Sequence, residues 1–239
     1  MLDLVGWLSS TQLVLIAAIA ASVVAVAVDW RLLLFMLGAA YAAASLLLSS
    51  VLPVPLTIVL LVGGFFVVLL LYWTGRHIQE AIEIATAPGG WSDIEHEVLP
   101  MSMSFRMLAL VVWVIGLLAM EQRLRLPPVD EALMTAALWM IAMSLLAIIL
   151  TRDPFKTTVA VLMFEQGFEL VFLAIEPGLV LIGLLGVTNL LTALVGAYLT
   201  IARNLRFVEA FPDPRSPEAL ARALAAFRRQ RMFAEEEAE

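Results

Sequence analysis

Seven long runs of apolar residues, each almost free of charge, dominate this sequence and limit how it can fold. A helix needs about 20 apolar residues to cross a hydrocarbon core about 30 Å thick. The runs are continuous and do not alternate with polar residues, which excludes the strands of an outer-membrane barrel. Only 15% of the 239 residues are charged, too few to cover a soluble domain of this size. The sequence therefore predicts an all-α integral membrane protein with about seven transmembrane helices.

Prolines and charged residues separate these runs and set the expected boundaries of the spans. Pro53 and Pro55 stand between the second and third runs, and Pro177 and Gly178 stand between the sixth and seventh. We expect the first span to be retained, because the polar leader around Asp3 lacks the basic start of a signal peptide. The seven expected spans are Leu13–Val28, Leu32–Leu52, Leu56–Trp73, Phe105–Met120, Ala132–Leu150, Thr157–Ile175 and Gly178–Ala202.

The distribution of polar residues divides the chain into four expected parts. An N-terminal membrane unit of three spans occupies 1–76, and a polar, partly amphipathic loop occupies 77–104. A second membrane unit of four spans follows at 105–206, and a tail occupies 207–239. In the tail, Ser216 and Pro217 have the pattern of a helix start and predict a short helix over Glu218–Phe233. That helix is a candidate to bind lipid headgroups or a partner, and a solvated surface helix is the alternative.

Basic residues in the loops predict the orientation of the chain in the membrane. The side opposite the C-terminus carries only Arg123 and Arg125. By the positive-inside rule, the C-terminus is expected in the cytoplasm and the N-terminus outside, in the inner (cytoplasmic) membrane of the cell. The short loops on the C-terminal side carry more basic residues: Arg31, Arg76, Arg106, Arg152 and Lys156.

The composition also excludes several classes of function. The chain has no cysteine, which excludes thiolate-held iron–sulfur clusters and covalent haem. Its two histidines, His77 and His96, both fall in the polar loop, and no nucleotide-binding motif occurs. We therefore expect no cofactor, no metal site and no nucleic-acid partner. If the chain belongs to an oxidoreductase, it is expected to be a non-catalytic membrane subunit.

Two acidic residues in the sixth span are the main candidates for a functional role. Glu165 follows Lys156 by nine residues, which is about 13–14 Å of helix at about 1.5 Å per residue. Half of the hydrocarbon core is about 15 Å, so Glu165 is expected near the midplane of the bilayer. Glu169 lies one turn further along the same face of the helix.

Carboxyl groups at this depth predict either proton transfer or specific packing. Desolvation and the proximity of the two acids disfavour the charged form, so at least one is expected to be protonated at neutral pH. If water reaches them, Glu165 and Glu169 can act as a proton relay. The alternative is that Glu165 is a neutral packing residue, helped by Gln166, and that Glu169 reaches solvent at the outer interface. Supporting polar candidates in the spans are Gln166, Thr188, Asn189 and Tyr41.

The segment from Arg152 to Leu205 resembles the hydrogenase-4 component E family. These are membrane subunits of formate hydrogenlyase-type complexes, related to chain K of NADH:quinone oxidoreductase and to the C subunits of Mrp-type antiporters. In that family a basic loop leads into a helix with a Met-Glu-Asn-Gly motif, and Phe164-Glu165-Gln166-Gly167 occupies that place here. The resemblance implies a chain-K-like helical unit with an extension at its N-terminus.

The resemblance also implies a function and a set of partners. The chain would be a small membrane subunit of a complex I-like or group 4 hydrogenase-like respiratory assembly, adding a buried carboxylate to a proton translocation path. Its partners would be antiporter-like subunits and hydrogenase-like or quinone-reductase-like subunits. The family carries further acids at positions that correspond to about Leu184 and Leu190 here, and neither of these residues is acidic. The missing acids favour a structural subunit that conducts nothing. A stand-alone solute transporter is the third hypothesis.

Overall fold

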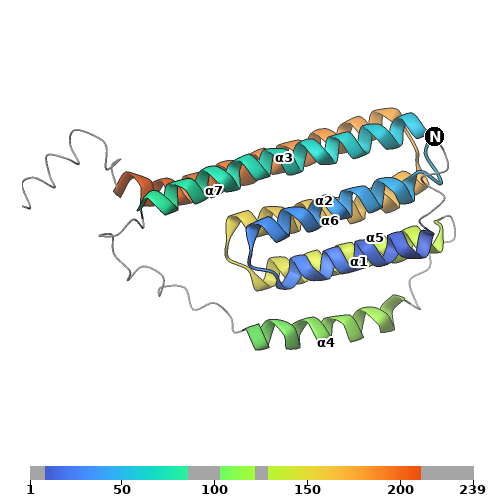
Figure 1. Cartoon of the computed structure of the whole chain (residues 1–239). Coiled ribbons are helices and arrows are strands. Elements are labelled where there is room, and N and C mark those ends of the chain that lie inside the picture. Colours follow the sequence, from blue (N-terminus) through green and yellow to red (C-terminus); the bar gives the residue numbers. More distant parts are fainter. Residues whose placement is uncertain (1–8, 86–102, 122–128, 211–239) are drawn as a thin grey trace, which may run out of the picture. The chain divides into compact units, whose positions relative to one another are not determined.

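The computed structural model describes residues 9–85, 103–121 and 129–210, and every regular element within these ranges is a helix. The described residues contain no strand, which confirms the predicted all-α architecture (Figure 1). The helices are α1 (Ser10–Val26), α2 (Trp30–Leu48), α3 (Val54–Ala85), α4 (Met103–Glu121), α5 (Glu131–Leu150), α6 (Pro154–Ile175) and α7 (Leu179–Ala210).

Five of these helices, α2, α3, α5, α6 and α7, are long and apolar enough to cross a membrane. The apolar parts of α1 and α4, Ser10–Val26 and Ser104–Met120, are shorter. Large apolar side chains such as Phe35, Phe65 and Val180 are exposed, as expected where a helix faces acyl chains. The chain is therefore an all-α, multi-pass protein of the lipid bilayer.

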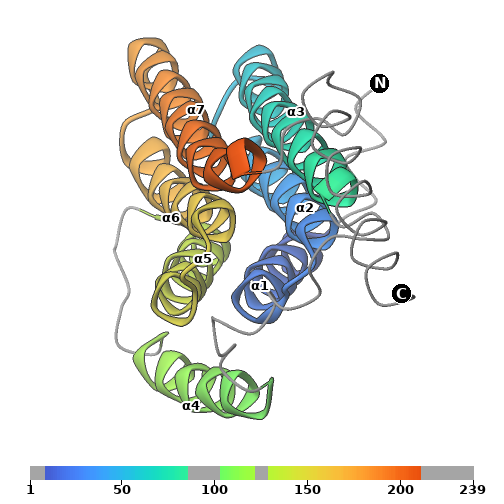
Figure 2. The same ribbon diagram turned by 90° about the vertical axis from the view of Figure 1, so that its left-hand side faces the viewer.

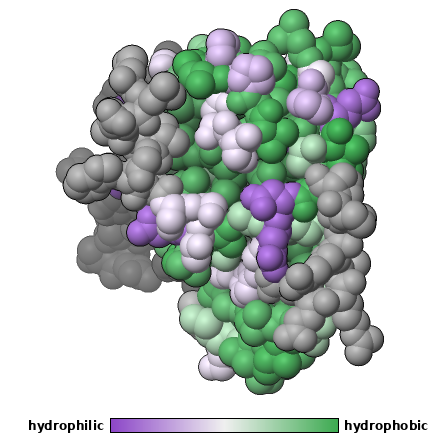
Figure 3. Space-filling model, turned by 90° about the vertical axis from the view of Figure 1, so that its right-hand side faces the viewer, coloured by the Kyte–Doolittle hydropathy of each residue, from purple (hydrophilic) through white to green (hydrophobic). Residues whose placement is uncertain are grey.

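The polar residues at the helix ends fit this arrangement. Figure 3 shows the end of the molecule at which α1, α3, α5 and α7 begin, where hydrophilic residues are mixed with hydrophobic ones. Gln12, Glu131 and Glu176 are exposed and lie at the corresponding helix ends. Charged and amide side chains placed at the ends of spans avoid the cost of burial in hydrocarbon.

Two helices are longer than the apolar pattern predicts. The third span was expected to end near Trp73, but α3 continues to Ala85, since the residues after Arg76 include good helix formers and no proline or glycine. Similarly, α7 runs past Ala202 to Ala210, into the predicted tail. Most of the predicted loop at 77–104 and the predicted helix over Glu218–Phe233 lie outside the described residues.

The chain divides into two compact units. The first is Met1–Gly75 with Val98–Thr200, and the second, Arg76–Glu97 with Ile201–Glu239, contains the C-terminal ends of α3 and α7. In the first unit, α1 packs against α2 and α5, and α6 packs against α5 and α2. Buried alanines such as Ala17, Ala44 and Ala137 let these four helices approach closely.

The helices of the first unit form two rows, α1–α2–α3 and α5–α6–α7 (Figure 2). In the first row, α3 lies on α2: a Cβ atom added at Gly64 would stand 2.5 Å from the ring of Tyr41. In the second row, α7 lies on α6, where Gly196 leaves space for the side chain of Thr158. Outside the rows, α4 packs on α5 and α1, and Trp113 Nε1 donates to the carbonyl of Ala142 at 2.8 Å.

Lys156 links the two rows at one end of the unit. The sequence placed it in a loop, but it lies in the first turn of α6, after the N-cap Asp153, and it is only 4% exposed. Its Nζ donates to the carbonyl oxygens of Ala25 at 3.0 Å and of Ala27 at 2.7 Å. These carbonyls stand at the C-terminal end of α1, where a cation is stabilised by the helix dipole.

Candidate functional site

The two acidic residues of α6 both bond to α7. Thr192 Oγ1 donates to Glu165 Oε1 at 2.7 Å, and Asn189 Nδ2 donates to Glu169 Oε2 at 3.2 Å. Residues four apart on α6 and three apart on α7 stack on one face, so the two pairs lie one turn from each other. The structure therefore brings Glu165 and Glu169 together with Asn189, one of the supporting polar candidates.

The two carboxyl groups differ in burial. Glu169 is 2% exposed, whereas Glu165 is half-buried. This contradicts the alternative that Glu169 reaches solvent at an outer interface. The reason is its position on α6: Glu169 points toward α7 and toward a cavity lined also by α2 and α3, and the neighbouring helices cover it.

Gln166 completes the environment of Glu169. Its Nε2 donates to Glu169 Oε2 at 3.3 Å, so one carboxyl oxygen accepts two hydrogen bonds. The second oxygen, Oε1, has no hydrogen-bond partner, and neither do Gln166 Oε1 and Glu165 Oε2. No basic side chain in the described part of the chain pairs with either carboxyl group. These buried oxygens therefore keep a free position for a hydrogen-bond donor.

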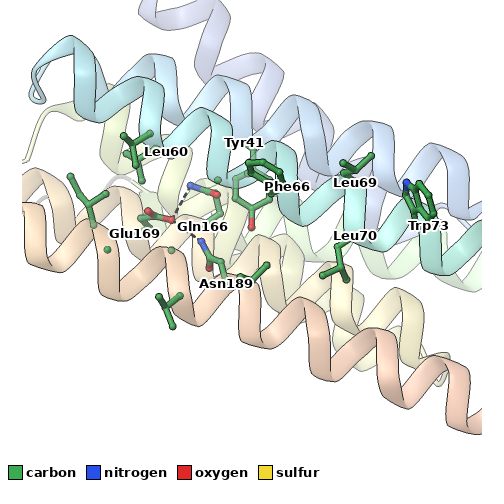
Figure 4. Close-up of a pocket in the computed structure, with 17 residues that line it drawn as sticks. Tyr41, Leu60, Phe66, Leu69, Leu70, Trp73, Gln166, Glu169 and Asn189 are labelled. Atoms are coloured by element: carbon green, nitrogen blue, oxygen red, sulfur yellow. Dashed lines mark hydrogen bonds between the residues drawn. The ribbon is translucent and has the colours of Figure 1, made fainter.

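Tyr41 lies on α2, close to Gln166 (Figure 4). Its side chain is buried, and its hydroxyl group has no hydrogen-bond partner. Tyr41 and Ser45 stand as far from the start of α2 as Glu165 and Glu169 stand from the start of α6. The first row of helices thus carries hydroxyl groups where the second row carries acids.

Thr188 does not join the site. Its hydroxyl donates to the carbonyl of Leu184 in its own helix at 3.0 Å, and the side chain is exposed. The residue that bonds to Glu165 is Thr192, one turn further along α7. Thr192 is, like Thr188 and Asn189, a polar residue of the seventh span that could bond to the sixth, and its spacing of three from Asn189 places both on one face of the helix.

The site opens into a cavity of about 620 Å³ between α3 and α7. Buried polar side chains from α2, α6 and α7 form its floor, as Figure 4 shows for Tyr41, Gln166, Glu169 and Asn189. Apolar side chains and glycines of α3 and α7 form its walls. Sequence analysis did not predict this cavity, because it depends on which helices are neighbours.

Two further findings concern metal ions and known proteins. The described residues contain no group of three or more histidine, aspartate or glutamate side chains that could hold a metal ion. No family model, curated protein or solved structure matches the chain.

Proposed function

We propose that this chain is a small membrane subunit of a complex I-like or group 4 hydrogenase-like respiratory assembly, and that Glu165 and Glu169 are part of its proton path. One observation carries the proposal: two carboxyl groups lie in the middle of an apolar span, bonded to polar groups of α7 and without a basic partner. Acidic residues at this depth are rare and commonly mark proton relays.

The geometry supports proton transfer in short steps. The Cβ atoms of residues one turn apart on a helix are separated by about 5–6 Å, a gap that a single water molecule can bridge. Glu165 Oε2 and Glu169 Oε1 each have a free position for a proton. The hydroxyl group of Tyr41 lines the same cavity as Glu169 and can extend the path toward α2.

The proposal includes the location and the partners expected from the sequence. The protein would lie in the cytoplasmic membrane with its C-terminus inside, between antiporter-like and hydrogenase-like or quinone-reductase-like subunits. The exposed faces of α3 and α7 offer surfaces for such neighbours. Buried acids of adjacent subunits would then continue the path.

A structural subunit that conducts nothing is the second candidate. Leu184 and Leu190 favour it, because these exposed positions of α7 carry leucine where the resembling family carries acids. In that role the hydrogen bonds of Thr192 and Asn189 would serve only to hold α6 and α7 together. The two candidate functions predict different effects on proton translocation when Glu165 and Glu169 are replaced by glutamine.

Proton translocation by the intact assembly distinguishes the two candidates. The tagged chain is purified with its partner subunits, reconstituted into liposomes, and assayed for protons moved per electron. Glu165→Gln and Glu169→Gln are expected to lower this ratio at least tenfold with normal assembly, and the exposed Glu176→Gln is the matched control. An unchanged ratio in both site variants, with assembly intact on native gels, would establish the structural role.

A further inference from the structure

The cavity between α3 and α7 is open on the side that faces away from α2 and α6. Several residues of both walls line the cavity and are also exposed at the surface of the protein. They include Phe66 and Trp73 on α3 and Val187 and Leu190 on α7. The floor residues, in contrast, are buried. Because the walls are apolar parts of membrane spans, a molecule would enter the cavity sideways from the bilayer.

Glycines make room in both walls. A Cβ atom added at Gly63, Gly183 or Gly186 would meet no other atom within 4 Å, although all three glycines line the cavity. These glycines therefore differ from Gly64, which is required for the contact of α3 with Tyr41. A cavity of about 620 Å³ lies in the range of about 300–1,000 Å³ typical of small-molecule sites.

The side chains that line the floor of the cavity contain buried oxygen atoms without a hydrogen-bond partner. Tyr41, Gln166 and Glu169 are each less than 5% exposed, and the Tyr41 hydroxyl, Gln166 Oε1 and Glu169 Oε1 have no hydrogen-bond partner. Buried polar atoms are nearly always paired, and leaving one unpaired costs about 1–3 kcal/mol. All three atoms can accept a hydrogen bond, and the Tyr41 hydroxyl can also donate one, so a group with several donors satisfies all three.

We infer that this cavity binds a lipophilic primary amine, with its ammonium group on the floor and its apolar body between α3 and α7. An ammonium group offers three N–H donors, as many as the floor has unpartnered oxygens. It also places a positive charge beside the carboxyl group of Glu169, which has no basic partner among the described residues. The rings of Tyr41 and Phe66 line the same cavity and add favourable contacts for a cation. The inference involves side chains that the proposed proton path also uses, but it rests on the cavity and its unpartnered oxygens, so amine binding and proton translocation can succeed or fail separately.

Binding of radiolabelled octylamine to the protein in nanodiscs tests the inference, with empty nanodiscs of the same lipid as the background. We expect saturable binding of one amine per chain. Octyltrimethylammonium, which has the charge without N–H donors, and octanol, which has a donor without the charge, are expected to bind at least tenfold more weakly. No saturable binding above empty nanodiscs, or equal binding of either analogue, would overturn the inference.

Two variants locate the bound amine. Glu169→Gln removes the acidic group of the floor. Gly186→Leu adds a side chain in a wall of the cavity, at a position where a Cβ atom meets no other atom within 4 Å. Each is expected to weaken octylamine binding at least tenfold. Gly116→Leu is the matched control, because Gly116 also lies in open space but outside the cavity. Wild-type affinity in Gly186→Leu would show that the amine binds elsewhere.

Discussion

At the scale of single residues, two kinds of polar group stand out in the described part of the chain. The groups at helix ends are satisfied: Lys156 donates to two carbonyl oxygens, and Asp153 accepts from backbone amides at the start of α6. The groups in the middle of the spans, Glu165 and Glu169, keep one oxygen without a partner. The first kind stabilises the fold, and the second is available for function.

Replacing Lys156 should destabilise the protein without changing its site. Lys156→Met leaves the carbonyl groups of Ala25 and Ala27 without their charged donor, and hydrogen bonds of this kind contribute about 1.5–3 kcal/mol. We expect the free energy of unfolding to fall by about 2 kcal/mol, measured by unfolding in detergent. Arg31→Met, at an exposed basic residue near the start of α2, is the control. Equal changes in the two variants would contradict the role of Lys156.

At the scale of helices, the sequence predicts the spans well and their ends less well. Hydropathy identifies α6 correctly, because an apolar span can be recognised from the composition of its own residues. It misses the extension of α3 to Ala85, because a helix that leaves the apolar region is no longer marked by apolar residues. Contacts between helices are likewise invisible in one sequence: nothing in it shows that Gly64 and Gly167 are contact residues and that Gly63 and Gly183 are not.

The glycines predict which helix pairs tolerate a larger side chain. A Cβ atom at Gly167 would stand 2.8 Å from Ile141 Cγ1 and 3.0 Å from the carbonyl oxygen of Ala137, so Gly167→Ala pushes α6 away from α5. Such overpacking costs about 1–3 kcal/mol, and we expect a lower melting temperature. Gly183→Ala meets nothing and should be neutral or slightly stabilising, since alanine favours a helix by about 1 kcal/mol over glycine. Equal melting temperatures for the two variants would contradict the close contact between α5 and α6.

At the scale of the whole molecule, the arrangement of the helices determines the burial of the two acids and the presence of the cavity, which the sequence does not show. The acids of α6 were identified from their depth in an apolar span. The sequence did not predict which of the two acids is more deeply buried, because it is the neighbouring helices that bury Glu169 more than Glu165. The cavity requires α3 and α7 to flank α2 and α6, a placement that no local pattern determines.

The absence of cysteine from the sequence makes the topology directly measurable. Single cysteines at the exposed positions Gln12, Glu131 and Glu176 lie at one end of the spans, and one at Thr151 lies at the other. We expect a membrane-impermeant maleimide to label the first three in intact cells, and to label the fourth only after permeabilisation. The opposite pattern would reverse the predicted orientation. A mixed pattern would contradict the prediction of seven spans.

The central claim is that carboxyl groups buried in α6 exchange protons with water. Infrared spectroscopy of the reconstituted protein, compared with the Glu165→Gln, Glu169→Gln double variant, measures this directly. We predict a carboxylic acid band at neutral pH that is absent from the variant and shifts when the solvent is changed to D₂O. A spectrum identical to that of the variant, or a band that does not respond to D₂O, would contradict the claim.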